Sequence, residues 1–507
     1  MKTGFDNEKY LQEQTAAILE RVEQFNNKLY LEFGGKLCYD YHAARVLPGY
    51  DPNVKIRLLQ KLRDKLEIIL CIFASDIEKR RIRGDFGISY DIATLKLIDD
   101  LRGWGLDIST VVITRFSKQP TAVMFKNKLE RRGIKVCTHA FIEGYPSDVD
   151  AVASAKGLGA NAYIETKAPI VVVTAPGPGS GKMATCLSQL YNDHKKGVHS
   201  GYAKFETFPI WNLALKHPVN IAYEAATADI QDYNLVDPFH LEAYGETTVN
   251  YNRDVEGFPI LREILKRIIG EEGKRPVYKS PTDMGVNRAG FGIVDDEAVK
   301  EASKQEIIRR HFRYMCEYIQ GVENEKTVER VKELMGSLKL KPEDRIVVMP
   351  ARKAAEEAEK KGKGNRGIFC GAAIELKDGS IVTGKNSPLM HASSSLIMNA
   401  IKTLMNIPDE ILLLSPNVID SIARMKEGIL GSESESLSLE ETLTALSISA
   451  ATNHTTEVAM EKLKELRGCE VHMTHLPTPG DEAGLKRIGV NLTTDPNFPS
   501  KNLFTEK

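Results

Sequence analysis

The segment that decides the fold is Ile170-Val171-Val172-Val173-Thr174-Ala175-Pro176-Gly177-Pro178-Gly179-Ser180-Gly181-Lys182-Met183. Its first five residues are apolar or β-branched and predict a buried strand. The glycine-rich turn then leads into a predicted helix that extends to Leu190. An uninterrupted apolar strand followed by a turn and a helix is typical of a parallel sheet that is covered by helices on both faces.

The same alternation of strands and helices continues on both sides of this segment. Strands are predicted at 68–74, 110–114, 135–138 and 219–224, and helices at 8–27, 91–103, 121–132, 147–158 and 257–270. Charged helical stretches follow at 296–336. The sequence therefore predicts an α/β domain with a doubly wound, mostly parallel sheet over residues 1–338.

A second, smaller α/β domain is expected over residues 339–507, after a linker at 338–344. Its predicted strands lie at 345–349, 368–376, 380–384, 411–415 and 469–473. Its predicted helices lie at 392–405, 417–429, 439–450 and 454–467. Asp378-Gly379 favours a two-residue hairpin turn between the second and third of these strands.

Composition excludes several classes of protein. The 507 residues carry 68 Lys and Arg against 69 Asp and Glu, so the basic excess that is usual in nucleic-acid-binding proteins is missing. An apolar run long enough for a membrane span and the layout of a signal peptide are also missing. The seven cysteines are scattered and form no CxxC pair, which argues against a disulfide framework and a zinc knuckle. We expect a cytoplasmic protein that forms a homo-oligomer.

The glycine-rich turn has the chemistry of a phosphate-binding loop. Gly177, Gly179 and Gly181 allow backbone N–H groups to curl around phosphate oxygens, and Ser180 lies among them. Lys182 would supply a mobile positive charge at the start of a helix whose dipole also favours anions. These residues predict a P-loop-like site for ATP, a related nucleotide or another phosphate.

Two departures from the usual phosphate-loop pattern weaken its metal-binding part. Pro176 stands where the first glycine is expected, and Met183 stands where a serine or threonine normally ligates Mg²⁺. Ser180 and Thr185 carry nearby hydroxyls, but neither occupies the required position. A tight strand-to-helix turn without a ligand is the alternative interpretation of the segment.

An acidic stretch downstream of the loop supplies candidate metal ligands. Carboxylates past the end of a strand can hold Mg²⁺ or orient water, and Asp229 and Asp232 would share a face if their segment were helical. Glu224 and Asp237 are further candidates, and Arg253 could clamp a phosphate. A polar loop, with an ordinary surface ion pair at Arg253, is the alternative.

The C-terminal domain resembles the cytidine deaminase fold over about forty residues. The resemblance rests on the strand Cys370-Gly371-Ala372-Ala373, the Asp378-Gly379 hairpin, Gly384-Lys385-Asn386 and the helix start His391-Ala392-Ser393. Deaminases need a glutamate where Ser393 stands and two cysteines where Asn417 and Asp420 stand, so zinc chemistry is not implied. His391 and Ser393 could bind an anion or simply cap the helix.

Taken from end to end, the chain resembles a bacterial family called domain of unknown function 1846. The segments that carry this resemblance are Gly4–Tyr10, Thr174–Lys182, Val236–His240 and Asn250–Asp254. The family brings no assigned activity. Lys182 and the glycine amides therefore predict nucleotide or phosphate binding, with ATP hydrolysis or phosphoryl transfer if Asp229, Asp232 and Arg253 act as catalytic groups. A non-catalytic ligand-binding or assembly protein, and nucleobase-like chemistry in the C-terminal domain, are the alternatives.

Overall fold

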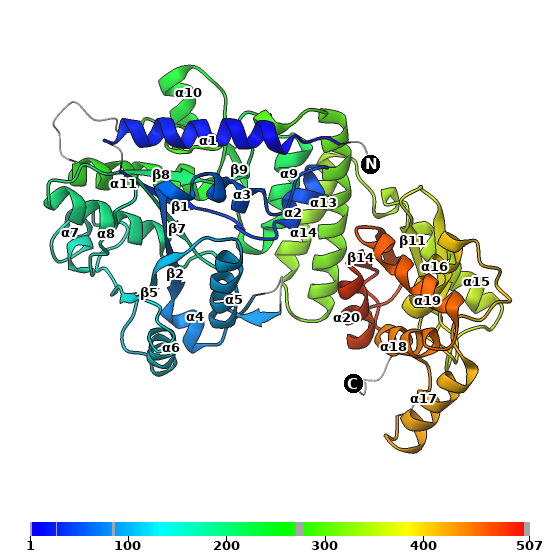
Figure 1. The fold of residues 1–507 in the computed structure, drawn as a ribbon. Helices are drawn as coiled ribbons and strands as arrows, with labels where there is room; N and C mark the ends of the chain where they lie inside the picture. The colour runs from blue at the N-terminus through cyan, green and yellow to red at the C-terminus, as the bar shows by residue number, and fades with distance from the viewer. Residues whose placement is uncertain (1–2, 27, 84–86, 270–277, 433, 501–507) are drawn as a thin grey trace. The chain divides into compact units, whose positions relative to one another are not determined.

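The structure, a computed structural model, describes residues 3–26, 28–83, 87–269, 278–432 and 434–500. These residues form two compact units, 2–303 and 304–507 (Figure 1). Each unit combines helices with a β-sheet, so the predicted mixed α/β fold is confirmed.

A six-stranded parallel sheet is the core of the N-terminal unit. Its strand order is β6-β5-β2-β7-β1-β8. The strands are β1 (Leu29–Phe33), β2 (Leu66–Phe73), β5 (Ile108–Thr114), β6 (Val136–Thr138), β7 (Ile170–Thr174) and β8 (Gly201–Phe205). Every residue of β1, β7 and β8 is buried, as expected for strands that helices cover on both sides.

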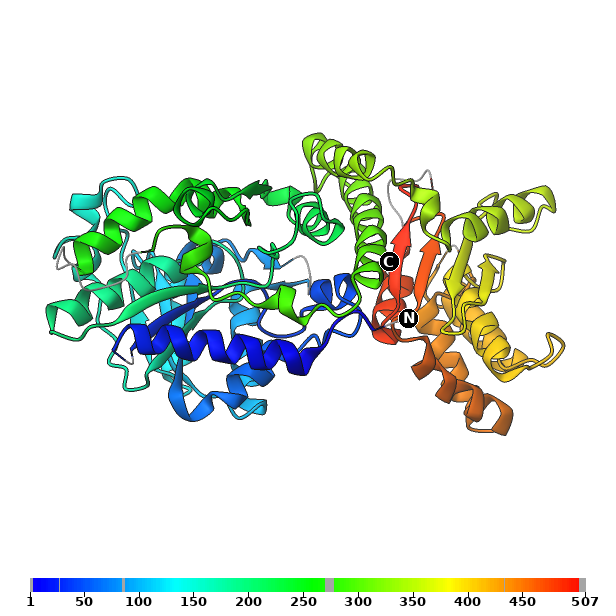
Figure 2. The same cartoon turned by 90° about the horizontal axis from the view of Figure 1, so that it is seen from above.

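Helices cover both faces of this sheet. The helices of this unit are α1 (Asn7–Gln24), α2 (Tyr41–Val46), α3 (Val54–Lys61), α4 (Ala74–Glu78), α5 (Tyr90–Gly103), α6 (Pro120–Glu130), α7 (Val149–Val152), α8 (Lys182–Lys195), α9 (Pro218–Ala226), α10 (Pro238–Tyr244), α11 (Asn252–Ile269) and α12 (Pro281–Met284). Helix α13 (Asp296–Ile319) begins in this unit and continues into the C-terminal unit. Helix α1 runs along one face and α11 along the other (Figure 2). Helix α8 packs against α11 and is tied to the sheet by a 2.8 Å hydrogen bond from Tyr30 on β1 to Asp193.

The winding of the sheet reverses beside β7. The chain leaves β1, passes β7 and enters β2, whereas it leaves β7, passes β1 and enters β8. Because such crossovers are right-handed, the two connections run over opposite faces. Ligands of open α/β sheets bind at the carboxyl ends of strands where the winding reverses, which is where the glycine-rich loop begins.

Two predicted elements of the N-terminal unit are wrong. Residues 219–224 belong to helix α9 and not to a strand, because Pro218 opens a helix that buries its apolar residues. The expected helix at 147–158 is limited to α7 and a 3₁₀ turn at Leu158–Ala160. The short hairpins β3/β4 (Ile82–Arg83 and Ile88–Ser89) and β9/β10 (Asn234–Val236 and Val249–Tyr251) were not expected.

The C-terminal unit has a four-stranded mixed sheet in the order β12-β11-β13-β14. The strands are β11 (Gly371–Glu375), β12 (Ile381–Lys385), β13 (Glu470–Met473) and β14 (Asn491–Thr494). Only the pair β13/β14 is parallel. The helices after α13 are α14 (Glu325–Ser337), α15 (Val348–Lys360), α16 (Ala392–Met405), α17 (Pro416–Gly428), α18 (Leu439–Ala450), α19 (His454–Glu461) and α20 (Pro479–Ile488).

Two predicted strands of this unit are also wrong. Residues 345–349 lead into helix α15, because Pro350 lies in the first turn and a run of strong helix formers follows. Residues 411–415 form no strand, and Ile411 and Leu412 are 44% and 61% exposed. Leu413 and Leu414 are buried in the core of the unit, so the run contributes two core residues without forming a strand.

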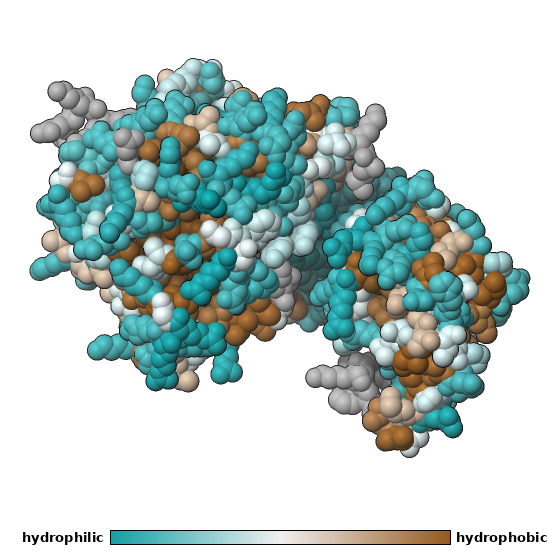
Figure 3. All heavy atoms as spheres, in the orientation of Figure 1, coloured by the Kyte–Doolittle hydropathy of each residue, from teal (hydrophilic) through white to brown (hydrophobic). Residues whose placement is uncertain are grey.

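Hydrophilic residues cover most of the face shown in Figure 3. An apolar area follows the end of α17, where Met425, Ile429 and Leu430 are exposed. Among the described residues, helices of at least 18 residues are too polar to cross a bilayer.

Candidate functional site

The glycine-rich loop joins β7 to α8 at the carboxyl edge of the sheet. Gly179 and Gly181 have left-handed φ angles of +68° and +85°, and Gly181 is the N-cap of α8. Left-handed residues at alternate positions turn neighbouring N–H groups toward one side and so form an anion-binding concavity. Pro178 and Gly179 are exposed, so the tip of the loop is open to a ligand.

The sides of the loop are fixed by close contacts with other strand ends. A Cβ at Gly177 would lie 2.3 Å from a ring carbon of Tyr90, the first residue of α5. Thr114, at the end of β5, donates a 2.8 Å hydrogen bond to the carbonyl of Ser180. Since β2 lies between β5 and β7, the loop passes over the end of β2. Only glycine fits at 177, and the loop is held on both sides.

Lys182 is the first residue of α8 and is half-buried. It forms no hydrogen bond or ion pair with any described residue. The nearby thiols of Cys71 and Cys186 do not neutralise it, because burial raises their pKa, for Cys71 to about 12. The Lys182 side chain is therefore a cation beside the loop with no hydrogen-bond or ion-pair partner in the described part of the chain.

Neither nearby hydroxyl is placed as a metal ligand. Ser180 turns its hydroxyl inward and donates a 3.0 Å hydrogen bond to the carbonyl of Gly177. Thr185 is completely buried, and its hydroxyl faces the Sγ atom of Cys71 at 3.4 Å. The loop supplies donors and a positive charge, but its own side chains supply no oxygen ligand for Mg²⁺.

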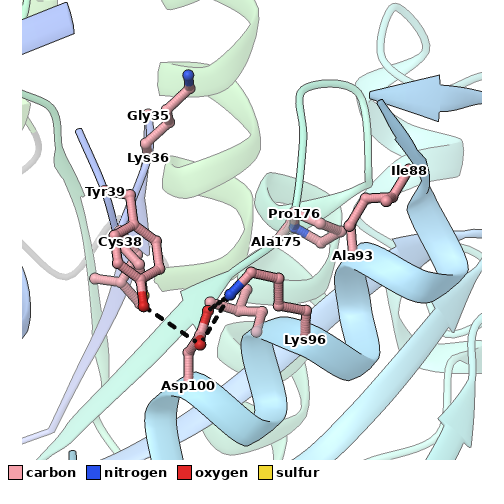
Figure 4. Close-up of a pocket in the computed structure, with 12 residues that line it drawn as sticks. Gly35, Lys36, Cys38, Tyr39, Ile88, Ala93, Lys96, Asp100, Ala175 and Pro176 are labelled. Carbon is pink, nitrogen blue, oxygen red and sulfur yellow. Dashed lines mark hydrogen bonds and ion pairs between the residues drawn. The ribbon is translucent and has the colours of Figure 1, made fainter. Parts of the chain in front are cut away.

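A small cavity lies beside the loop, between the ends of β1 and β7 (Figure 4). Its volume of about 30 Å³ is enough for about one water molecule. Gly35 and Pro176 line it, together with Lys96 and Asp100, which form a 2.8 Å ion pair. The cavity is too small for a nucleotide, so a larger ligand would have to lie on the open side of the loop.

The predicted acidic residues have separate roles. Asp229 is exposed on a single 3₁₀ turn that ends at Ile230, and the left-handed residue Gln231 separates it from Asp232. The two therefore do not share a helical face. Asp232 is buried and forms a 2.6 Å ion pair with Arg253, as the ion-pair interpretation of that arginine predicted.

The other two acidic candidates support the backbone. Glu224 is buried and accepts a hydrogen bond from the backbone N–H of Asn234 at 3.2 Å. Asp237 caps α10 by accepting from the N–H groups of Phe239 and His240. Within the described ranges no group of three or more His, Cys, Asp or Glu side chains is arranged to hold a metal ion.

A buried cluster of charged and phenolic side chains surrounds Lys204, the fourth residue of β8. Its Nζ lies 2.5 Å from Asp254 Oδ1 and 3.3 Å from Glu206 Oε1, and it also donates to the hydroxyl of Tyr251. Tyr251 in turn donates to Glu206 Oε1 at 3.1 Å. Glu32 on β1 is paired in register with Lys204 and accepts a 2.6 Å hydrogen bond from Tyr202.

The sequence prediction missed this cluster, although Asp232 and Arg253 lie at its edge. Arg253 and Asp254 both lie in the first turn of α11, and the guanidinium of Arg253 lies 5.6 Å from the centre of the Tyr251 ring. The sequence feature that could have revealed the cluster is the single lysine in the otherwise apolar run Gly201-Tyr202-Ala203-Lys204-Phe205.

The surroundings of Glu206 shift its pKa. Burial raises the pKa of Glu206 to about 7, and the negative charges of Asp254 and Glu32 add to this effect against the attraction of Lys204. Burial alone would lower the pKa of Lys204, but Asp254 and Glu206 raise it above its ordinary value, so the ammonium stays charged. A carboxyl group that is half-protonated near neutral pH can both accept and donate a proton.

His391 and Ser393 in the C-terminal unit meet on Asp481. His391 Nδ1 lies 2.8 Å from Asp481 Oδ2, and the Ser393 hydroxyl donates to Oδ1 at 2.7 Å. Asp481 also accepts from Thr478 and from the backbone N–H of Leu439. The carboxylate ties the start of α16 to those of α18 and α20, and it places a negative charge where an anion would have to bind.

Comparison with known protein families identifies relatives of the whole chain. A sequence model of the domain of unknown function DUF1846, N-terminal, matches residues 3–339, and the corresponding C-terminal model matches residues 343–504. A UPF0371 protein of Clostridium tetani (strain Massachusetts / E88) is 56% identical over 504 residues, or 99% of each chain. A UPF0371 protein of Clostridium botulinum (strain ATCC 19397 / Type A) is 57% identical over 505 residues, again 99% of each chain. The chain therefore belongs to the UPF0371 family, whose two parts are described as domains of unknown function DUF1846.

Proposed function

We propose that the N-terminal unit binds the phosphate group of a nucleotide or another phosphorylated small molecule at residues 176–182. The observation that carries this proposal is the combination of two left-handed glycines with Lys182 at the first turn of α8, whose side chain has no ion-pair partner among the described residues. Backbone N–H groups, a helix N-terminus and a lysine ammonium together form a site for an anion. The position at the carboxyl edge of a parallel sheet also favours it.

The same geometry favours phosphate binding over magnesium-dependent hydrolysis or phosphoryl transfer. Met183 takes the place of the metal-ligating hydroxyl, and Ser180 and Thr185 point into the protein. Asp229 and Asp232 do not converge on one point, and Asp232 is engaged by Arg253. Binding is therefore expected to persist when divalent metals are removed.

The C-terminal unit is a weaker candidate for chemistry. The segment whose sequence resembles the cytidine deaminase fold forms the β11/β12 hairpin and the helix α16. The zinc-binding residues of that fold are replaced, and His391 and Ser393 are engaged by Asp481. We propose a structural role for this part of the unit.

The experiment is an isothermal titration of the full chain with ATP and with pyrophosphate, each with Mg²⁺ and with EDTA. The variant Lys182→Ala removes the loop cation, and Lys195→Ala removes an exposed lysine at the other end of the same helix. A charged hydrogen bond contributes about 1.5–3 kcal/mol, so Lys182→Ala should weaken binding roughly ten- to a hundredfold. Equal affinities of the wild type and both variants would refute the assignment.

A further inference from the structure

Glu206, in the buried cluster around Lys204, has one carboxylate oxygen that accepts no hydrogen bond from the described residues. Glu206 Oε1 is held by Tyr251 and Lys204 at 3.1 and 3.3 Å. Oε2 of the same residue accepts no hydrogen bond in the described part of the chain, and it is not among the buried atoms that lack a partner. The side chain is 16% exposed, so Oε2 is the oxygen that faces solvent. Two donors thus fix the carboxylate in one orientation and leave its other oxygen open to a ligand.

Close contacts connect the Glu206 side chain to the end of β1, which lies beside the glycine-rich loop. A Cβ at Gly34, just after β1, would lie 2.6 Å from Glu206 Oε1, so Glu206 packs directly on the end of β1. The next residue, Gly35, lines the same small cavity as Pro176 of the loop. Because β7, β1 and β8 are neighbours and strands lie about 4.8 Å apart, the loop and Glu206 are separated by about 10 Å along one sheet edge.

A second line of contact runs along the face of the sheet that α8 covers. Glu32 lies on this face with Tyr30, which bonds to Asp193 of α8. The charges of Glu32 and Lys182 both act on the buried thiol of Cys186. Lys182 and Glu32, which belongs to the cluster around Lys204, therefore both lie near Cys186.

From these contacts we propose that Glu206 is the acid–base residue that acts on the ligand whose phosphate is held by residues 176–182. This inference rests on the proposed function. Oε2 accepts the proton of a ligand O–H or N–H group: that bond breaks, the electron pair stays on the ligand atom, and the proton forms an O–H bond on Glu206. Lys204 and Tyr251 are positioning residues that hold Oε1. The ligand class is a phosphorylated small molecule with an ionisable group about 10 Å from its phosphate.

The protonation of Glu206 depends on the groups that surround it. They are Lys204 on β8, Glu32 on β1, Tyr251 on β10, Asp254 on α11 and Tyr223 on α9. Burial raises the pKa of Glu206 to about 7 in the free protein. A dianion bound about 10 Å away would raise it further, by roughly a factor of ten in proton affinity once the Coulomb energy at an effective dielectric of about 20 is screened by salt at about 0.1 M. Binding of the anion should therefore be accompanied by uptake of a proton.

The test measures this proton uptake with sulfate as the probe. Sulfate keeps two negative charges throughout the assay range, so any proton taken up belongs to the protein. Titration calorimetry in two buffers of different ionisation enthalpy gives the number of protons bound per sulfate. For the wild type we expect about half a proton near pH 7.5, with smaller values at pH 6 and pH 9.

Three variants make the result specific. Glu206→Gln should bind sulfate without this proton uptake, whereas Glu263→Gln, at an exposed carboxylate of α11, should behave as the wild type. Lys182→Ala should lose sulfate binding. Sulfate binding that needs Lys182 but brings no proton uptake in the wild type would overturn the role of Glu206 alone, and this result requires no variant at Glu206 to fold. Sulfate binding that is unaffected by Lys182→Ala would overturn the proposed function first.

Discussion

Two glycines of the loop offer a matched pair of substitutions. Gly179 and Gly181 both have left-handed φ angles, +68° and +85°. A Cβ at Gly179 meets nothing within 4 Å, whereas a Cβ at Gly181 would lie 2.9–3.0 Å from three atoms of Thr114. Gly179→Ala therefore adds backbone strain alone, and Gly181→Ala adds the same strain and a steric conflict.

The magnitudes follow from these two differences. A left-handed conformation costs a residue with a Cβ about 1–2 kcal/mol, so both variants should lose about this much stability. In Gly181→Ala, Thr114 must also move, and its hydrogen bond to the carbonyl of Ser180 is lost, which adds about 1 kcal/mol. We expect a loss of about 1–2 kcal/mol for Gly179→Ala and about 2–3 kcal/mol for Gly181→Ala.

Tryptophan fluorescence during urea unfolding of the full chain is the appropriate assay. The chain has two tryptophans, Trp104 and Trp211, and both lie in the N-terminal unit. Their signal therefore reports the unit that contains the loop. Equal losses in the two variants, or a larger loss in Gly179→Ala, would refute the described packing of Gly181 against Thr114.

Three further predictions concern buried carboxylates. Because the pKa of Glu206 rises from 4.5 to about 7 on folding, ionisation of this carboxyl group lowers the free energy of unfolding as pH rises through this range. Glu206→Gln should therefore stabilise the N-terminal unit by about 2–3 kcal/mol at pH 8 and have little effect at pH 4, as measured by tryptophan fluorescence. Burial opposes ionisation of Asp495, but the imidazole of His472, 3.4 Å away, and hydrogen bonds from Arg352 hold its pKa at about 2. The stability that Asp495 provides is therefore complete above pH 3.8 and is lost as pH falls toward 2, and Asp495→Asn should remove this dependence in urea unfolding followed by circular dichroism. Asp481 accepts four hydrogen bonds, and in Asp481→Asn an NH2 group would face donors in place of one carboxylate oxygen. The variant should lower the stability of the C-terminal unit by about 2–3 kcal/mol in the same assay, and an unchanged unfolding midpoint would contradict these four hydrogen bonds.

The strands and helices with one consistent pattern were predictable from sequence. β2, β5 and β7 are apolar runs that end in glycine-rich or polar segments, and the structure confirms all three near their expected positions. Residues 219–224 and 345–349 are also apolar runs, but they form or begin helices. Short apolar runs do not by themselves distinguish a buried strand from one buried turn of helix, and the prolines at 218 and 350 were the deciding residues.

The site was only partly predictable for a different reason. The glycine-rich loop is local, so its residues are adjacent in sequence as well as in space. Glu206 and Tyr251 are separated by 45 positions and meet only because β8, β10 and α11 converge. Asp481 likewise joins His391 from 90 positions away. Contacts of this kind depend on the order of the strands and the packing of the helices, which one sequence does not determine.

The two neighbouring strands that the sequence prediction missed, of which the second is at the edge of the sheet, contain the strongest indication of function. β1, Leu29–Phe33, and β8, Gly201–Phe205, each have one charged residue in a buried segment, Glu32 and Lys204, and the two are partners in register. Removing two charges from water is costly, and a pair of well-packed apolar residues would serve stability as well or better. Stability alone therefore does not explain charges at these positions. A functional role does explain the pair of Glu32 and Lys204, because Lys204 fixes one oxygen of Glu206 at the sheet edge where the loop presents its N–H groups. The charged interruption that hides these strands from a hydrophobicity pattern is thus the feature that most directly supports an acid–base site beside the loop.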